Sequence, residues 1–121
     1  MKRERIVVTG MGAVTPVGIG VDNYWKNLIG GKSGTTYISR FDTCGMPVKI
    51  AAEVKDFSAE DFLPRKLVRN TDIFMHFALV AADEALEDSG IKANFNPERT
   101  GIVLGTCFGG ISTIVENQHE L

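Results

Sequence analysis

Residues 101–111, Gly-Ile-Val-Leu-Gly-Thr-Cys-Phe-Gly-Gly-Ile, decide how the fold of the chain is interpreted. The apolar run at 102–104 is short and uninterrupted, which is typical of a strand covered on both faces in a parallel sheet. Gly105, Gly109 and Gly110 follow it and let the backbone turn sharply beside a cleft. Because ligands of open α/β sheets collect at the carboxyl ends of strands, we expect the chemistry near this turn.

The rest of the chain predicts alternating strands and helices. The expected elements are a strand at 6–10, a helix at 22–29, a strand at 48–54, a helix at 71–89, a strand at 101–104 and a helix from 111 onward. Asp22 is expected to cap the first helix and Gly90 to end the second. The many alanines of 71–89 predict close packing against a sheet or another helix. The connections are long enough for parallel pairing, so the fold class is α/β.

One face of the helix at 71–89 is expected to be polar. It carries Asp83, Glu84, Glu87 and Asp88, opposite the apolar and alanine-rich face.

Composition excludes several classes of function. With 121 residues and a formal net charge of −2, the chain has no general attraction to nucleic acid or anionic membranes. No apolar run approaches the roughly 18–20 residues that span a bilayer. The first residues lack the apolar region of a secretory signal, and the two cysteines, Cys44 and Cys107, have no metal or redox spacing. A cytoplasmic, reducing location is expected.

The end of the sequence predicts a helix without a stop signal. Ile111, Ile114 and Val115 repeat at helical spacing, and residues 116–121 contain neither glycine nor proline. Buried strands without neighbours would also leave their edges uncovered. We expect residues 1–121 to be the first part of a longer protein.

Nucleotide and metal sites are not predicted. The segment Gly10-Met11-Gly12 follows a predicted strand, but a dinucleotide fingerprint needs a third glycine and a helix directly after it. Thr15 and Pro16 stand there instead. His76 and His119 have no companion at metal-ligand spacing and are expected to be packing or surface residues.

Two other features have both a functional and an ordinary interpretation. Cys107 lies in the turn after a predicted strand, where nucleophiles are often placed, but no base can be assigned to activate its thiol. The alternative is a small residue in a cleft wall. The cluster Arg65-Lys66-x-x-Arg69 is either a docking site for an acidic or phosphate-bearing partner or a solvated surface patch.

Several short motifs occur in order along nearly the whole chain. They are Val7-Val8-Thr9-Gly10-Met11-Gly12, Pro16-Val17-Gly18, Trp25, Gly31-Lys32-Ser33-Gly34, Phe41-Asp42-Thr43, Val54-Lys55-Asp56-Phe57, Asp72-x-Phe74, Ala85-x-x-Asp88-Ser89-Gly90 and Gly105-x-x-x-Gly109-Gly110. Each is weak alone, but their order and spacing resemble the opening of elongating β-ketoacyl-acyl-carrier-protein synthases, the type II ketosynthases of fatty-acid and polyketide synthesis.

The resemblance implies a thiolase-like fold, in which two similar α/β halves stack as five α-β-α-β-α layers, usually in a homodimer. Residues 1–121 would supply part of the first half and end before the nucleophile elbow. The implied activity is that of a 3-oxoacyl-[acyl-carrier-protein] synthase, an acyltransferase. It performs decarboxylative Claisen condensation of an acyl thioester with malonyl-carrier protein, without an organic cofactor.

The family's cysteine nucleophile, in a Thr-Ala-Cys-Ser-like elbow, and its two histidines fall beyond residue 121. The resemblance therefore assigns no catalytic residue here, and we expect residues 1–121 alone to be inactive. Cys107 corresponds to a position that is not the nucleophile. Phe108 corresponds to a residue, often Ile, at the gate of the acyl pocket, so Cys107, Phe108 and Gly109 are assigned to substrate binding. The larger benzyl group is expected to shorten or guard the pocket, or to rotate aside without affecting chain length.

Lys66 and Arg69 match the basic residues on which the family docks its acidic, phosphopantetheine-bearing carrier protein, and Arg65 adjoins them. Asn70 stands where many members have another basic residue, which predicts weaker or altered docking. Two alternatives stay open. One is a non-catalytic, chain-length-setting partner subunit of a type II polyketide synthase, and the other is a short protein that binds carrier protein without chemistry.

Overall fold

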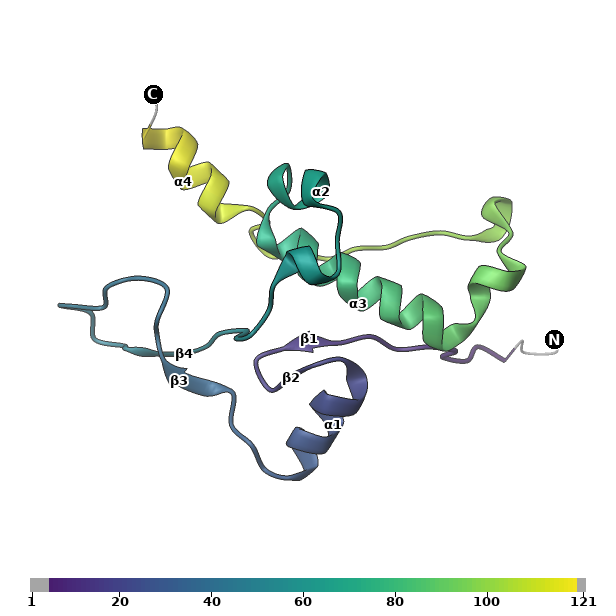
Figure 1. Ribbon diagram of the computed structural model, residues 1–121, viewed down its shortest axis with the longest axis horizontal. Coiled ribbons are helices and arrows are strands. Elements are labelled where there is room, and N and C mark those ends of the chain that lie inside the picture. Colours follow the sequence, from purple (N-terminus) through teal and green to yellow (C-terminus); the bar gives the residue numbers. More distant parts are fainter. Residues whose placement is uncertain (1–4, 120–121) are drawn as a thin grey trace.

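The computed structural model describes residues 5–119, so Glu120 and Leu121 of the predicted last helix lie outside the described residues. The elements in order are β1 (Val14–Thr15), β2 (Gly18–Ile19), α1 (Val21–Ile29), β3 (Thr35–Tyr37), β4 (Ile50–Ala52), η1 (Ala59–Asp61), α2 (Arg65–Arg69), α3 (Ile73–Ser89), η2 (Ile91–Asn94), η3 (Pro97–Arg99) and α4 (Ile111–His119). Helix α3 lies at the centre, with β1, β2 and α1 on one side and α2 on the other in the view of Figure 1.

The N-terminal segment packs its backbone directly on α3. A Cβ atom at Gly10 or Gly12 would overlap the backbone of α3 at Ala85 or Ala81. Only glycine permits this approach against a helix face made of small residues. The expected close packing of the alanines is confirmed, although the glycines that approach them lie in an irregular segment just before β1.

Two carboxylates on the polar face of α3, the half-buried Glu84 and the exposed Asp88, bind backbone amides of the N-terminal segment. Ala13 N donates to Glu84 Oε2 at 2.9 Å, and Val21 N donates to Glu84 Oε1 at 2.7 Å. Met11 N donates to Asp88 Oδ2 at 3.0 Å. Glu84 thus holds the β1 segment and the start of α1 together, which satisfies amides that no strand or helix bond engages.

The helix ends follow local signals. Gly90 ends α3 in the left-handed conformation with φ 65°, as predicted. The predicted cap Asp22 is wrong by two positions, because Gly20 occupies the N-cap of α1 and Asp22 lies in its first turn. A negative charge there is still favourable at the positive end of the helix dipole. Lys92 Nζ lies 2.7 Å from Asp83 Oδ1, and this hydrogen bond raises the pKa of Lys92.

The expected parallel pairing is wrong for the described residues. They form two antiparallel pairs, β1 with β2 and β3 with β4, in which Val14 faces Ile19 and Thr35 faces Ala52. The predicted strand at 48–54 survives as the shorter β4.

The predicted strands at 6–10 and 101–104 are irregular in the structure. Within residues 5–119 neither has a strand beside it to complete a ladder, and a strand needs a partner for its N–H and C=O groups. Their side chains are correspondingly exposed to solvent, with Ile6 97% and Val103 99% exposed.

The interior of the described part is small. Of the residues that the structure describes, His76 and Val80 alone are buried, and both lie on α3. An open, mainly apolar hollow of about 950 Å³ flanks α3, and its lining includes Phe62, Leu79 and Ile102. Between residues 5 and 119, no helix has both the length and the apolar character needed to cross a bilayer.

Candidate functional site

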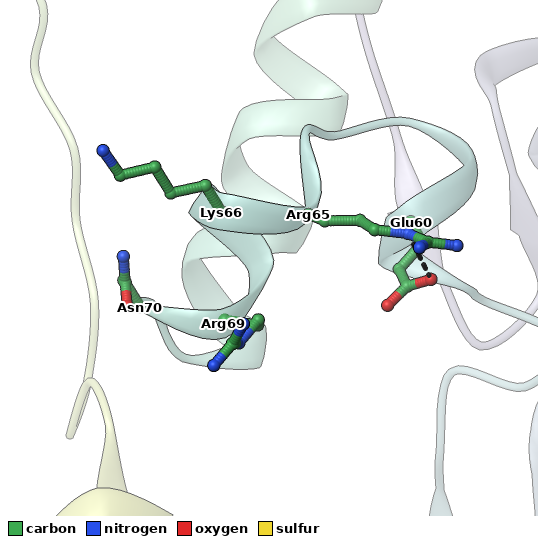
Figure 2. A pocket seen from close by; sticks show the side chains of 5 residues that line it. All are labelled: Glu60, Arg65, Lys66, Arg69 and Asn70. Atoms are coloured by element: carbon green, nitrogen blue, oxygen red, sulfur yellow. Dashed lines mark ion pairs between the residues drawn. The ribbon is translucent and has the colours of Figure 1, made fainter.

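The basic cluster predicted from the sequence lies on the short helix α2. Pro64 precedes the helix and Asn70 follows it. Glu60, Asn70 and the three cations line an open hollow of about 710 Å³. Figure 2 shows Lys66 and Asn70 pointing to one side of the helix, whereas Arg65 points the opposite way, toward Glu60.

The cations of α2 differ in how much of their charge is available. Arg65 Nε lies 3.6 Å from Glu60 Oε2, and both side chains are largely exposed. Such a pair is worth about 0–1 kcal/mol, but it partly neutralises Arg65. Among the described carboxylates, none forms an ion pair with Lys66 or Arg69. The side chains best placed to meet an anion are therefore Lys66 and Arg69.

A hydrogen-bonded threonine connects the end of α2 to α3. Thr71 Oγ1 donates to the carbonyl oxygen of Leu67 at 2.6 Å and lies 3.0 Å from His76 Nε2. His76 is 6% exposed, which confirms the packing role predicted for it. The side chain of His119 is outside the described part. No group of side chains suited to a metal ion occurs in the part of the chain that is described.

The glycine turn at 105–110 has the conformation that its sequence predicts, although no strand precedes it. Gly109 has φ 60°, and its N–H donates to Thr106 Oγ1 at 3.2 Å. Cys107 is a free, exposed thiol, and Phe108 is 76% exposed. This chain therefore presents Cys107 and Phe108 on an open surface, and their assignment to substrate binding remains a prediction.

Asp72 fastens this turn to the start of α3. Thr113 Oγ1, in the first turn of α4, donates to Asp72 Oδ1 at 2.5 Å. Gly110 lies so close that a Cβ atom there would overlap the Asp72 carboxyl group. Asp72 directly follows Thr71, so the same end of α3 holds both α2 and the turn (Figure 1).

The sequence pointed to the two clusters but not to the residues that join them. Asp72 stands in one of the motifs, without an indication of its partner. Thr71 and His76 carried no signal, because their hydrogen bond depends on how α2 meets α3.

This arrangement can bind an anionic partner at α2 and display an aromatic side chain nearby. Over residues 5–119, neither Cys107 nor Cys44 has a hydrogen-bonded base that would make its thiol a nucleophile. The second free thiol, Cys44, is exposed in the loop between β3 and β4.

Comparison with known proteins gives one consistent family. The family model described as "Beta-ketoacyl synthase, N-terminal domain" matches residues 3–120. The 3-oxoacyl-[acyl-carrier-protein] synthase 2 of Coxiella burnetii is 43% identical over 100% of this chain and 30% of its own length. The protein of the same name from Synechocystis sp. is 38% identical over 100% of this chain and 29% of its own. This chain thus spans about 30% of the length of these relatives.

Polyketide proteins are also similar. The granaticin polyketide putative beta-ketoacyl synthase 2 of Streptomyces violaceoruber is 37% identical over 98% of this chain and 29% of its own. Among solved structures, the ishigamide ketosynthase/chain length factor superposes with a TM-score of 0.73 and 29% identity over 94% of this chain and 29% of that one. The superposition confirms a partial thiolase-like fold.

Proposed function

Because this chain belongs to the β-ketoacyl synthase family, we propose that it forms the N-terminal portion of a 3-oxoacyl-[acyl-carrier-protein] synthase. The observation that carries the proposal is the identity of 43% to such an enzyme along the entire chain. The exposed runs at 6–8 and 102–104 support it, because apolar surface of this extent normally marks an interface. Further polypeptide of the same protein would cover them.

The proposed reaction lengthens an acyl chain by two carbons. A cysteine thiolate takes the acyl group from a carrier thioester, and malonyl-carrier protein then loses CO₂. The resulting carbanion attacks the acyl thioester, so that a C–C bond forms, the C–S bond breaks and 3-oxoacyl-carrier protein leaves. We propose, on the family resemblance, that this cysteine and two histidines lie outside residues 1–121 and that the reaction uses no organic cofactor. We also propose that the full-length protein is a homodimer in the cytoplasm. Sedimentation of the full-length protein tests the dimer.

The roles proposed for this chain are carrier docking and one wall of the acyl site. Lys66 and Arg69 would contact the acidic carrier protein. Arg65 would contribute less, because its charge is partly neutralised by Glu60. Phe108, with Cys107 and Gly109, would face the acyl group once the remaining polypeptide closes the site.

Charge reversal tests the docking role. In the full-length enzyme, Arg69→Glu should raise the apparent KM for carrier-protein substrates steeply at low salt, and the effect should shrink as salt increases. Lys26→Glu, a matched reversal of an exposed cation on α1, should leave this KM near that of the wild type. Equal effects of the two variants would favour a solvated patch over a docking site.

A second candidate is the non-catalytic partner subunit that sets chain length, because the solved relative pairs a ketosynthase with a chain length factor. The downstream sequence distinguishes the two candidates, since an elbow cysteine and two histidines are required only by the enzyme.

The decisive assay supplies acyl- and malonyl-carrier protein to the full-length protein and measures CO₂ and 3-oxoacyl-carrier protein. Formation of both supports the synthase. Their absence, together with a missing elbow cysteine, supports the partner subunit.

A further inference from the structure

Thr71 makes two hydrogen bonds, one to the Leu67 carbonyl and one with the His76 ring. A threonine hydroxyl has one proton, and we assign it to the shorter of the two bonds, to the Leu67 carbonyl oxygen 2.6 Å away. Thr71 Oγ1 must therefore act as the acceptor toward His76 Nε2, 3.0 Å away. The proton of His76 is thus on Nε2, and donation runs from His76 through Thr71 to Leu67.

Helix α2 depends on contacts of this kind. It has 5 residues, which is too short for a helix to be stable by its own propensity. Its backbone bonds include donation from Leu67 N to the Pro64 carbonyl at 2.8 Å and from Asn70 N to the Leu67 carbonyl at 3.1 Å. The Leu67 carbonyl therefore accepts from Asn70 and from Thr71, and the second bond leads to a buried anchor on α3.

His76 is suited to be that anchor. Its ring is 6% exposed on a helix of 17 residues, whereas the cationic side chains of α2 are exposed. The buried ring can hold the end of α2 in one orientation without itself reaching the surface.

We propose that His76 is a positioning residue for carrier-protein docking. Through Thr71 it fixes the orientation of α2, and so the direction in which Lys66 and Arg69 meet the partner. This inference rests on the proposed function. It concerns only binding through the carrier protein and predicts no effect on a substrate that lacks it.

Matched variants of the full-length enzyme test the proposal. Thr71→Val is nearly isosteric and removes the hydroxyl, whereas Thr71→Ser keeps it. Thr71→Val should raise the apparent KM for acyl-carrier protein about fivefold, which is what one neutral hydrogen bond is worth, with kcat unchanged. Thr71→Ser should stay within about twofold of the wild type.

Changes at His76 provide the second arm. His76→Gln can still donate a proton toward Thr71 and should rescue much of the loss seen in His76→Leu. The double variant Thr71→Val, His76→Leu should have an apparent KM for acyl-carrier protein no higher than that of the more impaired single variant. The two residues act through one hydrogen-bonded chain, so their effects should not add.

The control substrate is the same acyl group on pantetheine, without carrier protein. Its KM should be unchanged in every variant. The proposal is overturned if carrier and pantetheine KM values rise together, if kcat falls with both substrates, or if Thr71→Ser is as impaired as Thr71→Val.

Measuring the Kd for carrier protein distinguishes failure of this inference from failure of the proposed function. A wild-type protein that neither condenses nor binds carrier protein refutes the proposed function and this inference with it. Wild-type binding with an unchanged Kd in Thr71→Val refutes this inference alone.

Discussion

Replacing Glu84 by alanine should release the segment that leads into α1. Glu84 is a half-buried residue of α3 and accepts from Ala13 N at 2.9 Å and from Val21 N at 2.7 Å. The side chain thus holds two backbone amides that come from different parts of the N-terminal segment. Its removal leaves both without their partner.

The structure sets the size of the effect. A hydrogen bond to a charged group contributes about 1.5–3 kcal/mol. Because water can partly replace the carboxylate at this half-buried position, we take the lower figure for each bond, which gives about 3 kcal/mol for the pair. That corresponds to a loss of roughly a hundredfold in protection against amide exchange, since 1.4 kcal/mol is tenfold.

Hydrogen exchange of the full-length protein, followed by mass spectrometry, measures this locally. Peptides covering residues 11–21 should lose protection in Glu84→Ala, while those from the middle of α3 keep it. Glu87→Ala is the matched control, because Glu87 is exposed and makes only a 3.5 Å contact with Lys92. Equal protection of residues 11–21 in the two variants would refute the role assigned to Glu84.

Three further predictions concern the acyl wall, the glycine packing and one carboxylate. Phe108→Ala in the full-length enzyme should shift preference toward longer acyl chains in acyl-transfer assays; an unchanged preference would contradict the pocket role. Gly12→Ala should lower the free energy of unfolding by about 1–3 kcal/mol in chemical denaturation, because its Cβ would overlap a carbonyl of α3. The hydrogen bond from the Ser39 hydroxyl holds the pKa of Glu53 below its ordinary value of 4.5. The ionised carboxylate therefore stabilises the fold above pH 4.5, and this stabilisation is lost as the pH falls through the lowered pKa. Ser39→Ala should raise the pKa of Glu53 measured by NMR titration, and an unchanged pKa would contradict this.

Local signals were sufficient to predict the long helix and its end. The periodicity of 71–89 and the glycine after it require no information from elsewhere in the chain, and α3 with its left-handed Gly90 follows. The basic cluster and the glycine turn were likewise evident, since both are short and carried by residue type.

Features that depend on distant partners could not be predicted. A strand forms only beside another strand, so the apolar runs at 6–10 and 102–104 gave wrong expectations for the described residues. Helical periodicity placed Glu84 on the polar face of the helix but could not identify its partners, because the amides it binds lie 63 and 71 residues away. For the candidate site, Thr113 lies 41 residues from Asp72, and no sequence pattern links them.

We propose that residues 1–121 form one wall of the acyl site and the docking surface for the carrier protein, while a cysteine elsewhere in the protein is acylated. Trapping the acylated full-length enzyme with an acyl-carrier protein, followed by proteolysis and mass spectrometry, tests it most directly. The acyl group should be found on a cysteine outside residues 1–121, with Cys44 and Cys107 unmodified. An acyl thioester on Cys107 would contradict it.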